Sequence, residues 1–111
     1  MAAANSPVLL DLNNPDFLES LFALEKNDKI QLLKQLEKIS KLTWIEVQRD
    51  TGLKWEKIYP VPVMLQRHLL DDKQRAIYSI RLTQAKRAVV LRDGNYMRFL
   101  ALPKDHDSTY A

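Results

Sequence analysis

The sequence predicts an α+β protein in which a helical hairpin packs on a mostly antiparallel β-sheet. Residues 15–42 repeat their apolar side chains at helical spacing. Residues 77–102 contain three short β-type segments, and Asp93-Gly94 between the last two is typical of a tight hairpin turn. The predicted order is strand, helix, helix, a short third helix and three strands, which suits one domain spanning residues 1–111.

The first elements are a short strand and a helix. Val8–Leu12 is apolar and is followed by NNP, which ends a strand. Asn14 can then cap a helix whose first residue is Pro15, because the first helical position needs no backbone N–H. We expect this helix to end near Lys26.

A second amphipathic helix completes the predicted hairpin. We expect Asn27 or Asp28 to cap it after a turn at Glu25–Asp28, and we expect it to run to about Leu42. Its apolar residues recur at helical spacing, whereas its lysines fall largely on the other side. The apolar residues are Leu32, Leu33, Leu36 and Ile39.

A capping box opens the short third helix. Thr43 and Glu46 have the spacing at which each side chain bonds the other residue's backbone N–H. The helix should run through Asp50 with Gly52 as its C-terminal cap. In the link Leu53–Ala76, LKWEKI fits either a strand or a helical turn, YPVPV must be extended, and MLQRHLLDD suits a short helix.

The last part of the chain predicts a meander of three strands, Ile77–Thr83, Arg87–Arg92 and Tyr96–Leu102. Tyr78, Ile80 and Leu82 should share one face of the first strand, and Ser79, Arg81 and Thr83 the other. We therefore expect one face of the meander to contact the helices and the other to be free to carry charge.

Composition and charge narrow the functional classes. The chain has no cysteine, no apolar run near the ~20 residues of a membrane span and no signal-peptide pattern, so we expect a cytoplasmic protein without thiolate metal sites. Residues 1–74 carry ten Lys or Arg and eleven Asp or Glu, but residues 75–111 carry seven and three, a net charge of +4. Such asymmetry favours a polyanionic partner, although an ordinary solvated face has the same composition. With two glycines and no nucleotide-binding motif, we expect no small-molecule cofactor.

The segment IYSIRLTQAKRAVVLRDGNYMRFLALPKDHDSTY, Ile77 to Tyr110, resembles the RelE/ParE superfamily of toxins from bacterial type II toxin–antitoxin pairs. Members have a tyrosine-led strand, a basic residue near the start of the next strand, an apolar last strand and a basic-then-tyrosine tail. The resemblance implies a single RelE-like toxin domain over residues 1–111. RelE-like members cut mRNA in the ribosomal A site, whereas ParE-like members poison DNA gyrase and lack the nuclease residues. Ser79 stands where some relatives have a lysine.

The tail favours the RelE-like branch, and the resemblance implies the residues of its site. Arg81 and Arg87 match basic positions on the first and second meander strands, Lys104 and His106 match the late basic residues, and Tyr110 matches the terminal tyrosine. The implied protein is a ribosome-dependent mRNA endonuclease whose partners are a cognate antitoxin, the ribosome and mRNA, with no membrane. Further RNA contacts are expected from Lys86, Arg92 and Arg98.

Metal-free RNA cleavage needs a base for the ribose 2′-OH, cations to stabilise the phosphorane and an acid for the departing 5′-oxygen. The guanidiniums of Arg81 and Arg87 suit the second task, so we expect them to point to the same side of the sheet with the last eight residues near both. The sequence leaves open which of Lys104, His106 and Tyr110 is the base and which is the acid.

Other interpretations remain open. One alternative is a ParE-like module that poisons gyrase, and another is an adaptor that binds RNA with a steep salt dependence but does not cleave it. Asp105–Asp107 suits a turn better than a metal site, because adjacent residues rarely converge on one ion. Arg92 and Arg98 flank the hairpin and should face solvent or the antitoxin. We assign to the core the aromatic residues Trp44, Trp55 and Tyr59.

Overall fold

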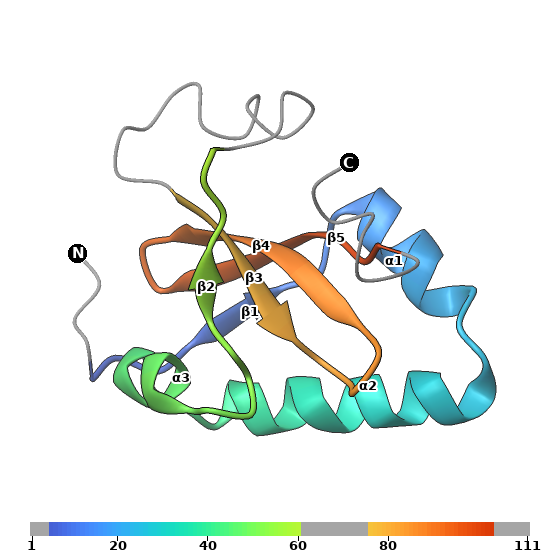
Figure 1. Ribbon diagram of the computed structural model, residues 1–111, viewed down its shortest axis with the longest axis horizontal. Helices are drawn as coiled ribbons and strands as arrows, with labels where there is room; N and C mark the ends of the chain where they lie inside the picture. Colours follow the sequence, from blue (N-terminus) through green and yellow to red (C-terminus); the bar gives the residue numbers. More distant parts are fainter. Residues whose placement is uncertain (1–4, 61–75, 104–111) are drawn as a thin grey trace.

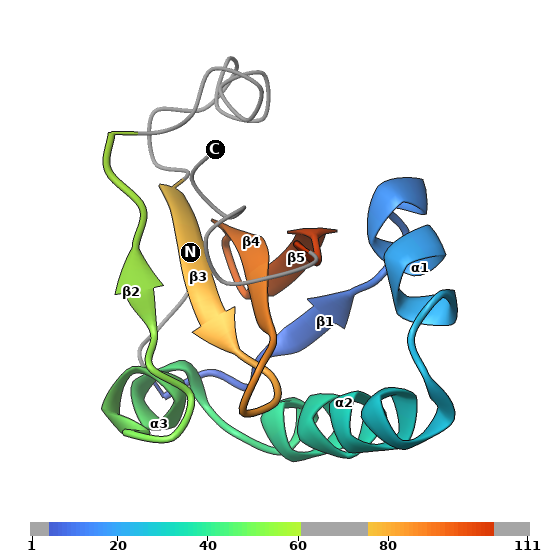
Figure 2. The same cartoon turned by 45° about the vertical axis from the view of Figure 1, so that its right-hand side comes forward.

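The protein forms a five-stranded sheet with three helices packed on one of its faces (Figures 1 and 2). The computed structural model describes residues 5–60 and 76–103. The strand order is β1-β5-β4-β3-β2. The elements are β1 (Leu9–Asp11), α1 (Pro15–Phe22), α2 (Lys26–Ser40), α3 (Trp44–Arg49), β2 (Glu56–Lys57), β3 (Ala76–Arg81), β4 (Arg87–Asp93) and β5 (Tyr96–Ala101). The predicted fold class is confirmed. Among the described residues no helix has the length and apolar character that crossing a bilayer requires.

The boundary between the first two helices differs from the prediction. Helix α1 ends at Phe22, and α2 begins directly after Glu25. The backbone N–H of Lys29 donates to the carbonyl of Glu25 at 2.9 Å, so the helical bonds of α2 already begin there. The predicted caps Asn27 and Asp28 are therefore wrong, because both residues lie in the first turn of α2, where an acid such as Asp28 favours the positive end of the helix dipole.

The capping box at the start of α3 is confirmed. The N–H of Thr43 donates to Glu46 Oε1 at 2.9 Å, and the N–H of Glu46 donates to Thr43 Oγ1 at 3.3 Å. Gly52, in contrast, is not the C-terminal cap. The side chain of Asp50 ends the helix by accepting from the N–H groups of Gly52 and Leu53, at 2.8 and 3.0 Å.

The meander forms as predicted and gains a strand at each edge. Strands β3, β4 and β5 are antiparallel, and Gly94 takes a φ of 63° in the β4–β5 turn. Strand β1 adds to β5 in parallel, and β2 adds to β3 antiparallel, so LKWEKI contains a strand. The remainder of the YPVPV segment after Pro60 and the predicted helix in MLQRHLLDD lie outside the described residues.

The main core lies between the helices and one face of the sheet, called here the helix-covered face. On it Phe17 of α1 contacts Phe99 of β5 with ring centroids 5.1 Å apart. Trp44 is buried and Trp55 packs against this core, as predicted. Tyr59 does not belong to the core: it is 85% exposed, because it lies beyond Ile58, whose N–H still bonds to β3.

The opposite face of the sheet is called the second face. Alternation along the strands places there Ile77, Ser79 and Arg81 of β3 and Arg87, Val89 and Leu91 of β4. Its centre is a buried apolar cluster of Ile58, Ile77, Val89, Leu91 and Leu100. The expectation that this face is free to carry charge is thus correct only at its ends.

Candidate functional site

Two arginines face each other at one end of the second face. Arg81 ends β3, Arg87 begins β4, and the two are direct cross-strand partners, so their side chains lie on the same side of the sheet as expected. Like charges directly opposite each other destabilise a sheet. In addition, Arg81 Nε is buried and has no hydrogen-bond partner. The pair therefore has unused capacity to bind an anion.

Arg87 is held firmly from within the protein. Its side chain is only 9% exposed. Its Nε and Nη2 donate to Ser79 Oγ, at 2.8 and 2.5 Å, and Nη2 also donates to the carbonyl of Lys54 at 3.0 Å. Among the described residues these hydrogen bonds involve only Nε and Nη2, which leaves the Nη1 side of the guanidinium for another group.

One carboxylate lies beside the arginine pair, and sequence analysis missed it. Glu56 of β2 is the register partner of Ser79, and its Oε1 lies 3.8 Å from Arg87 Nη2. The Glu56 side chain is 59% exposed, so a ligand can reach it. Reading LKWEKI as an edge strand of this sheet would have indicated Glu56, but the sequence did not distinguish a strand from a helical turn there.

Arg98 lies at the other end of the second face and is neutralised. It forms ion pairs with Asp11 of β1 and, at 3.1 Å, with Asp93 of β4, and its guanidinium lies 4.7 Å from the ring centroid of Tyr96. Burial lowers the pKa of Arg98, but the hydrogen bonds to Asp11 and Asp93 outweigh it, so the pKa lies above its ordinary value. Arg98 is therefore paired with two acids, while its side chain stays 37% exposed, in agreement with the expectation that it faces solvent.

Arg92 is directed to the opposite side of the sheet. Its guanidinium lies 4.0 Å from the ring centroid of Trp44, a cation–π contact on the helix-covered face. Burial lowers the pKa of Arg92, against the opposing effect of Tyr78. The structure does not bring Arg92 together with Arg81 and Arg87.

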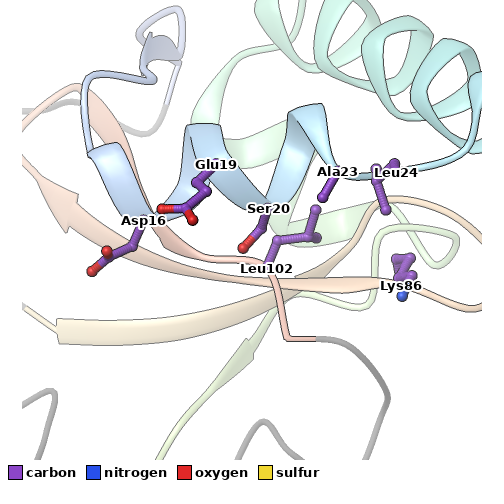
Figure 3. Close-up of a pocket in the computed structure, with 7 residues that line it drawn as sticks. All are labelled: Asp16, Glu19, Ser20, Ala23, Leu24, Lys86 and Leu102. Atoms are coloured by element: carbon purple, nitrogen blue, oxygen red, sulfur yellow. The ribbon is translucent and has the colours of Figure 1, made fainter.

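Lys86 belongs to a different region again. It lines a cavity of about 440 Å³ between α1 and the end of β5, together with Asp16, Glu19 and Leu102 (Figure 3). This cavity is lined by two acids and a serine of α1, one lysine and apolar side chains, and neither Arg81 nor Arg87 lines it. Lys86, Arg92 and Arg98 thus lie in three different regions of the structure. Their RNA contacts stay predictions from the sequence.

Three predicted site residues, Lys104, His106 and Tyr110, lie outside the described residues. Within residues 5–60 and 76–103 there is no group of three or more His, Cys, Asp or Glu side chains suited to hold a metal ion. The site that the structure describes therefore consists of Arg81, Arg87 and Glu56, with Ser79 beneath them.

Comparison with known proteins gives one structural relative. No family model and no curated protein match the chain. The solved structure of the YoeB dimer from Staphylococcus aureus matches with a TM-score of 0.51 and 17% sequence identity, over 91% of this chain and 100% of that one. The fold shared with YoeB is the RelE/YoeB-like fold. The chain has a RelE-like fold.

The RelE-like fold agrees with the sequence resemblance. The resemblance rested on the motif of residues 77–110 and on the order of the elements before it, and the structural match extends over 91% of the chain. In this RelE-like fold the arginine pair and Glu56 lie on the second face, which the three helices do not cover.

Proposed function

We propose that the protein is the toxin of a type II toxin–antitoxin pair and inhibits translation as a ribosome-dependent mRNA endonuclease. The observation that carries the proposal is the pairing of Arg81 directly opposite Arg87, with the exposed carboxylate of Glu56 beside them. Two guanidiniums suit a phosphate group, because charged N–H donors form strong hydrogen bonds to its oxygens, and Arg87 keeps its Nη1 side for this contact. The RelE-like fold supports the same class of function.

The arrangement supplies two of the three groups that RNA cleavage needs. Glu56 takes the proton from the ribose 2′-OH as the 2′-oxygen bonds to phosphorus. Arg81 and Arg87 stabilise the negative charge that collects on the phosphorane oxygens. The P–O5′ bond then breaks, an acid protonates the 5′-oxygen, and the products are a 2′,3′-cyclic phosphate and a 5′-hydroxyl. The acid is assigned to the predicted tail residues Lys104, His106 and Tyr110.

The ribosome is required because the described site cannot orient RNA by itself. Glu56 is exposed at the edge of the sheet, and a correct approach of the 2′-OH to phosphorus contributes a large share of the rate. The mRNA held in the ribosome provides that alignment. The free protein should therefore cleave naked RNA slowly or not at all.

The proposed antitoxin has two surfaces to cover. One is the arginine pair, and the other is the helical hairpin, where Phe22 is 67% exposed and Ile30 and Leu33 are also exposed. An amphipathic helix recognises such apolar side chains in a row. If the antitoxin uses the hairpin, Leu33→Glu should keep its toxicity in cells but should no longer be neutralised by the co-expressed antitoxin. Unchanged protection would exclude the hairpin.

The test measures cleavage of mRNA on programmed ribosomes by purified protein. Arg87→Ala should lower the cleavage rate by about 10²–10³-fold, and Glu56→Gln by about 10²–10⁴-fold. Arg49→Ala is the matched control, because Arg49 is an exposed arginine on α3. His106→Ala tests the predicted acid in the same assay.

Two results would reject the proposal. In cells, continued translation with a rising DNA-damage response would indicate a gyrase-directed protein. In vitro, RNA that is bound with a steep salt dependence but left intact would indicate an adaptor.

A further inference from the structure

Ser79 is unusual for its position in the sheet. It lies in the centre of β3 and is fully buried, and among the described residues it is the only buried polar side chain. Its neighbours along the second face of β3 are Ile77 and Arg81. A buried hydroxyl needs a hydrogen-bond partner, so its contacts indicate what it does there.

Among the described residues, the side-chain hydrogen bonds of Ser79 are made with Arg87. Its Oγ accepts from both Nε and Nη2 of the same guanidinium, at 2.8 and 2.5 Å. Hydrogen bonds from a charged donor are shorter and stronger than those between neutral groups. Because two nitrogens of one rigid plane converge on one oxygen, the plane can rotate little without losing both bonds.

The segment before β2 closes the other side of the guanidinium. The carbonyl of Lys54 accepts from Arg87 Nη2 at 3.0 Å, and the carbonyl of Leu53 accepts from the backbone N–H of Arg81 at 2.7 Å. Lys54 has a φ of 46°, in the left-handed region that residues with a side chain rarely adopt. Such backbone conformations persist only where the surrounding structure holds them, and they cluster at functional sites.

We infer that Ser79 is a positioning residue for the proposed cleavage: with the Lys54 carbonyl it fixes the Arg87 guanidinium so that its Nη1 side is presented to the scissile phosphate. This inference rests on the proposed function. Ser79 touches no substrate in this scheme and acts only through Arg87. A purely structural hydroxyl, which merely satisfies a buried cation, would affect stability but not the orientation of that cation.

The kinetic experiment uses single-turnover cleavage on saturating programmed ribosomes. Ser79→Ala should lower the rate by at least about tenfold, since small misplacements of catalytic groups cost up to about 10²-fold, and should leave the half-saturating ribosome concentration within about twofold. Ser79→Thr keeps the hydroxyl and should restore most of the rate. In an Arg87→Ala background, Ser79→Ala should have no further effect. A rate for Ser79→Ala within twofold of wild type, or losses that multiply in the double variant, would overturn the inference.

A spectroscopic experiment separates this inference from the proposed function. The Nε–H signal of Arg87, assigned by its absence in Arg87→Lys, should be protected from solvent exchange in the wild-type protein and unprotected in Ser79→Ala. If Ser79→Ala does not fold, Ser79→Cys takes its place in the experiment, because the thiol has a similar volume but is a weak acceptor. The Nε–H of Arg87 should be unprotected in this variant too. Equal protection in the wild type and in the folded variant contradicts the positioning role. Absence of cleavage by the wild type contradicts only the proposed function.

Discussion

Replacing Arg81 with methionine should stabilise the fold and at the same time remove activity. Arg81 is the direct partner of Arg87 across the two strands, and like charges in such positions cost about 0.2–1 kcal/mol. Its Nε is buried without an acceptor, and an unsatisfied buried polar group costs about 1–3 kcal/mol. Methionine keeps an unbranched apolar stem and removes both penalties.

The expected gain in the free energy of unfolding is about 1–2 kcal/mol. This value lies toward the lower end of the sum of the two costs, because Arg81 is only half-buried and keeps part of its hydration. Urea denaturation followed by tryptophan fluorescence measures it, with Arg49→Met as the control that should change by less than about 0.5 kcal/mol. Cleavage by Arg81→Met should fall by about 10²–10³-fold in the ribosome assay.

A loss of stability in Arg81→Met would refute this reasoning. It would mean that the charge of Arg81 has a favourable partner in the folded protein, so that the arginine pair is part of the structural framework. A gain in stability with unchanged cleavage would instead show that the pair is strained but not catalytic. Gain together with lost activity is the pattern that functional sites produce when they are maintained against stability.

Two further predictions concern the framework around the site. The backbone N–H of Asn13 and the guanidinium of Arg98 hold the pKa of Asp11 below its ordinary value of 3.8. The ionised carboxylate therefore contributes stability above pH 3.8, and this stability is lost as the pH falls below that value. In Asp11→Asn the free energy of unfolding should fall less steeply in that acidic range. An equally steep fall in Asp11→Asn would contradict this. Trp44→Phe should lower the free energy of unfolding by about 2–4 kcal/mol, because the Asn95 carbonyl loses the indole N–H that donates to it at 3.1 Å and because the buried ring becomes smaller. A loss below about 1 kcal/mol in a denaturant titration would show that this hydrogen bond is not significant.

The sequence alone determined those features that depend on neighbouring residues. The capping box of Thr43 and Glu46 and the hairpin at Gly94 follow from groups a few residues apart, and both were predicted correctly. The shared side of Arg81 and Arg87 was also predicted correctly, whereas the register that places them directly opposite each other comes from the structure. The roles of Lys104, His106 and Tyr110 stay predictions from resemblance.

The tertiary structure decided which cations remain available to an anion. The meander contains one acid between Arg75 and Lys104, so its sequence appears uniformly basic. Acids from distant segments change this: Asp11 on β1 neutralises Arg98, and Glu56 on β2 joins Arg87. Strand pairing between remote segments depends on the burial of the whole sheet and not on local propensity, and for this reason neither acid could be placed from sequence.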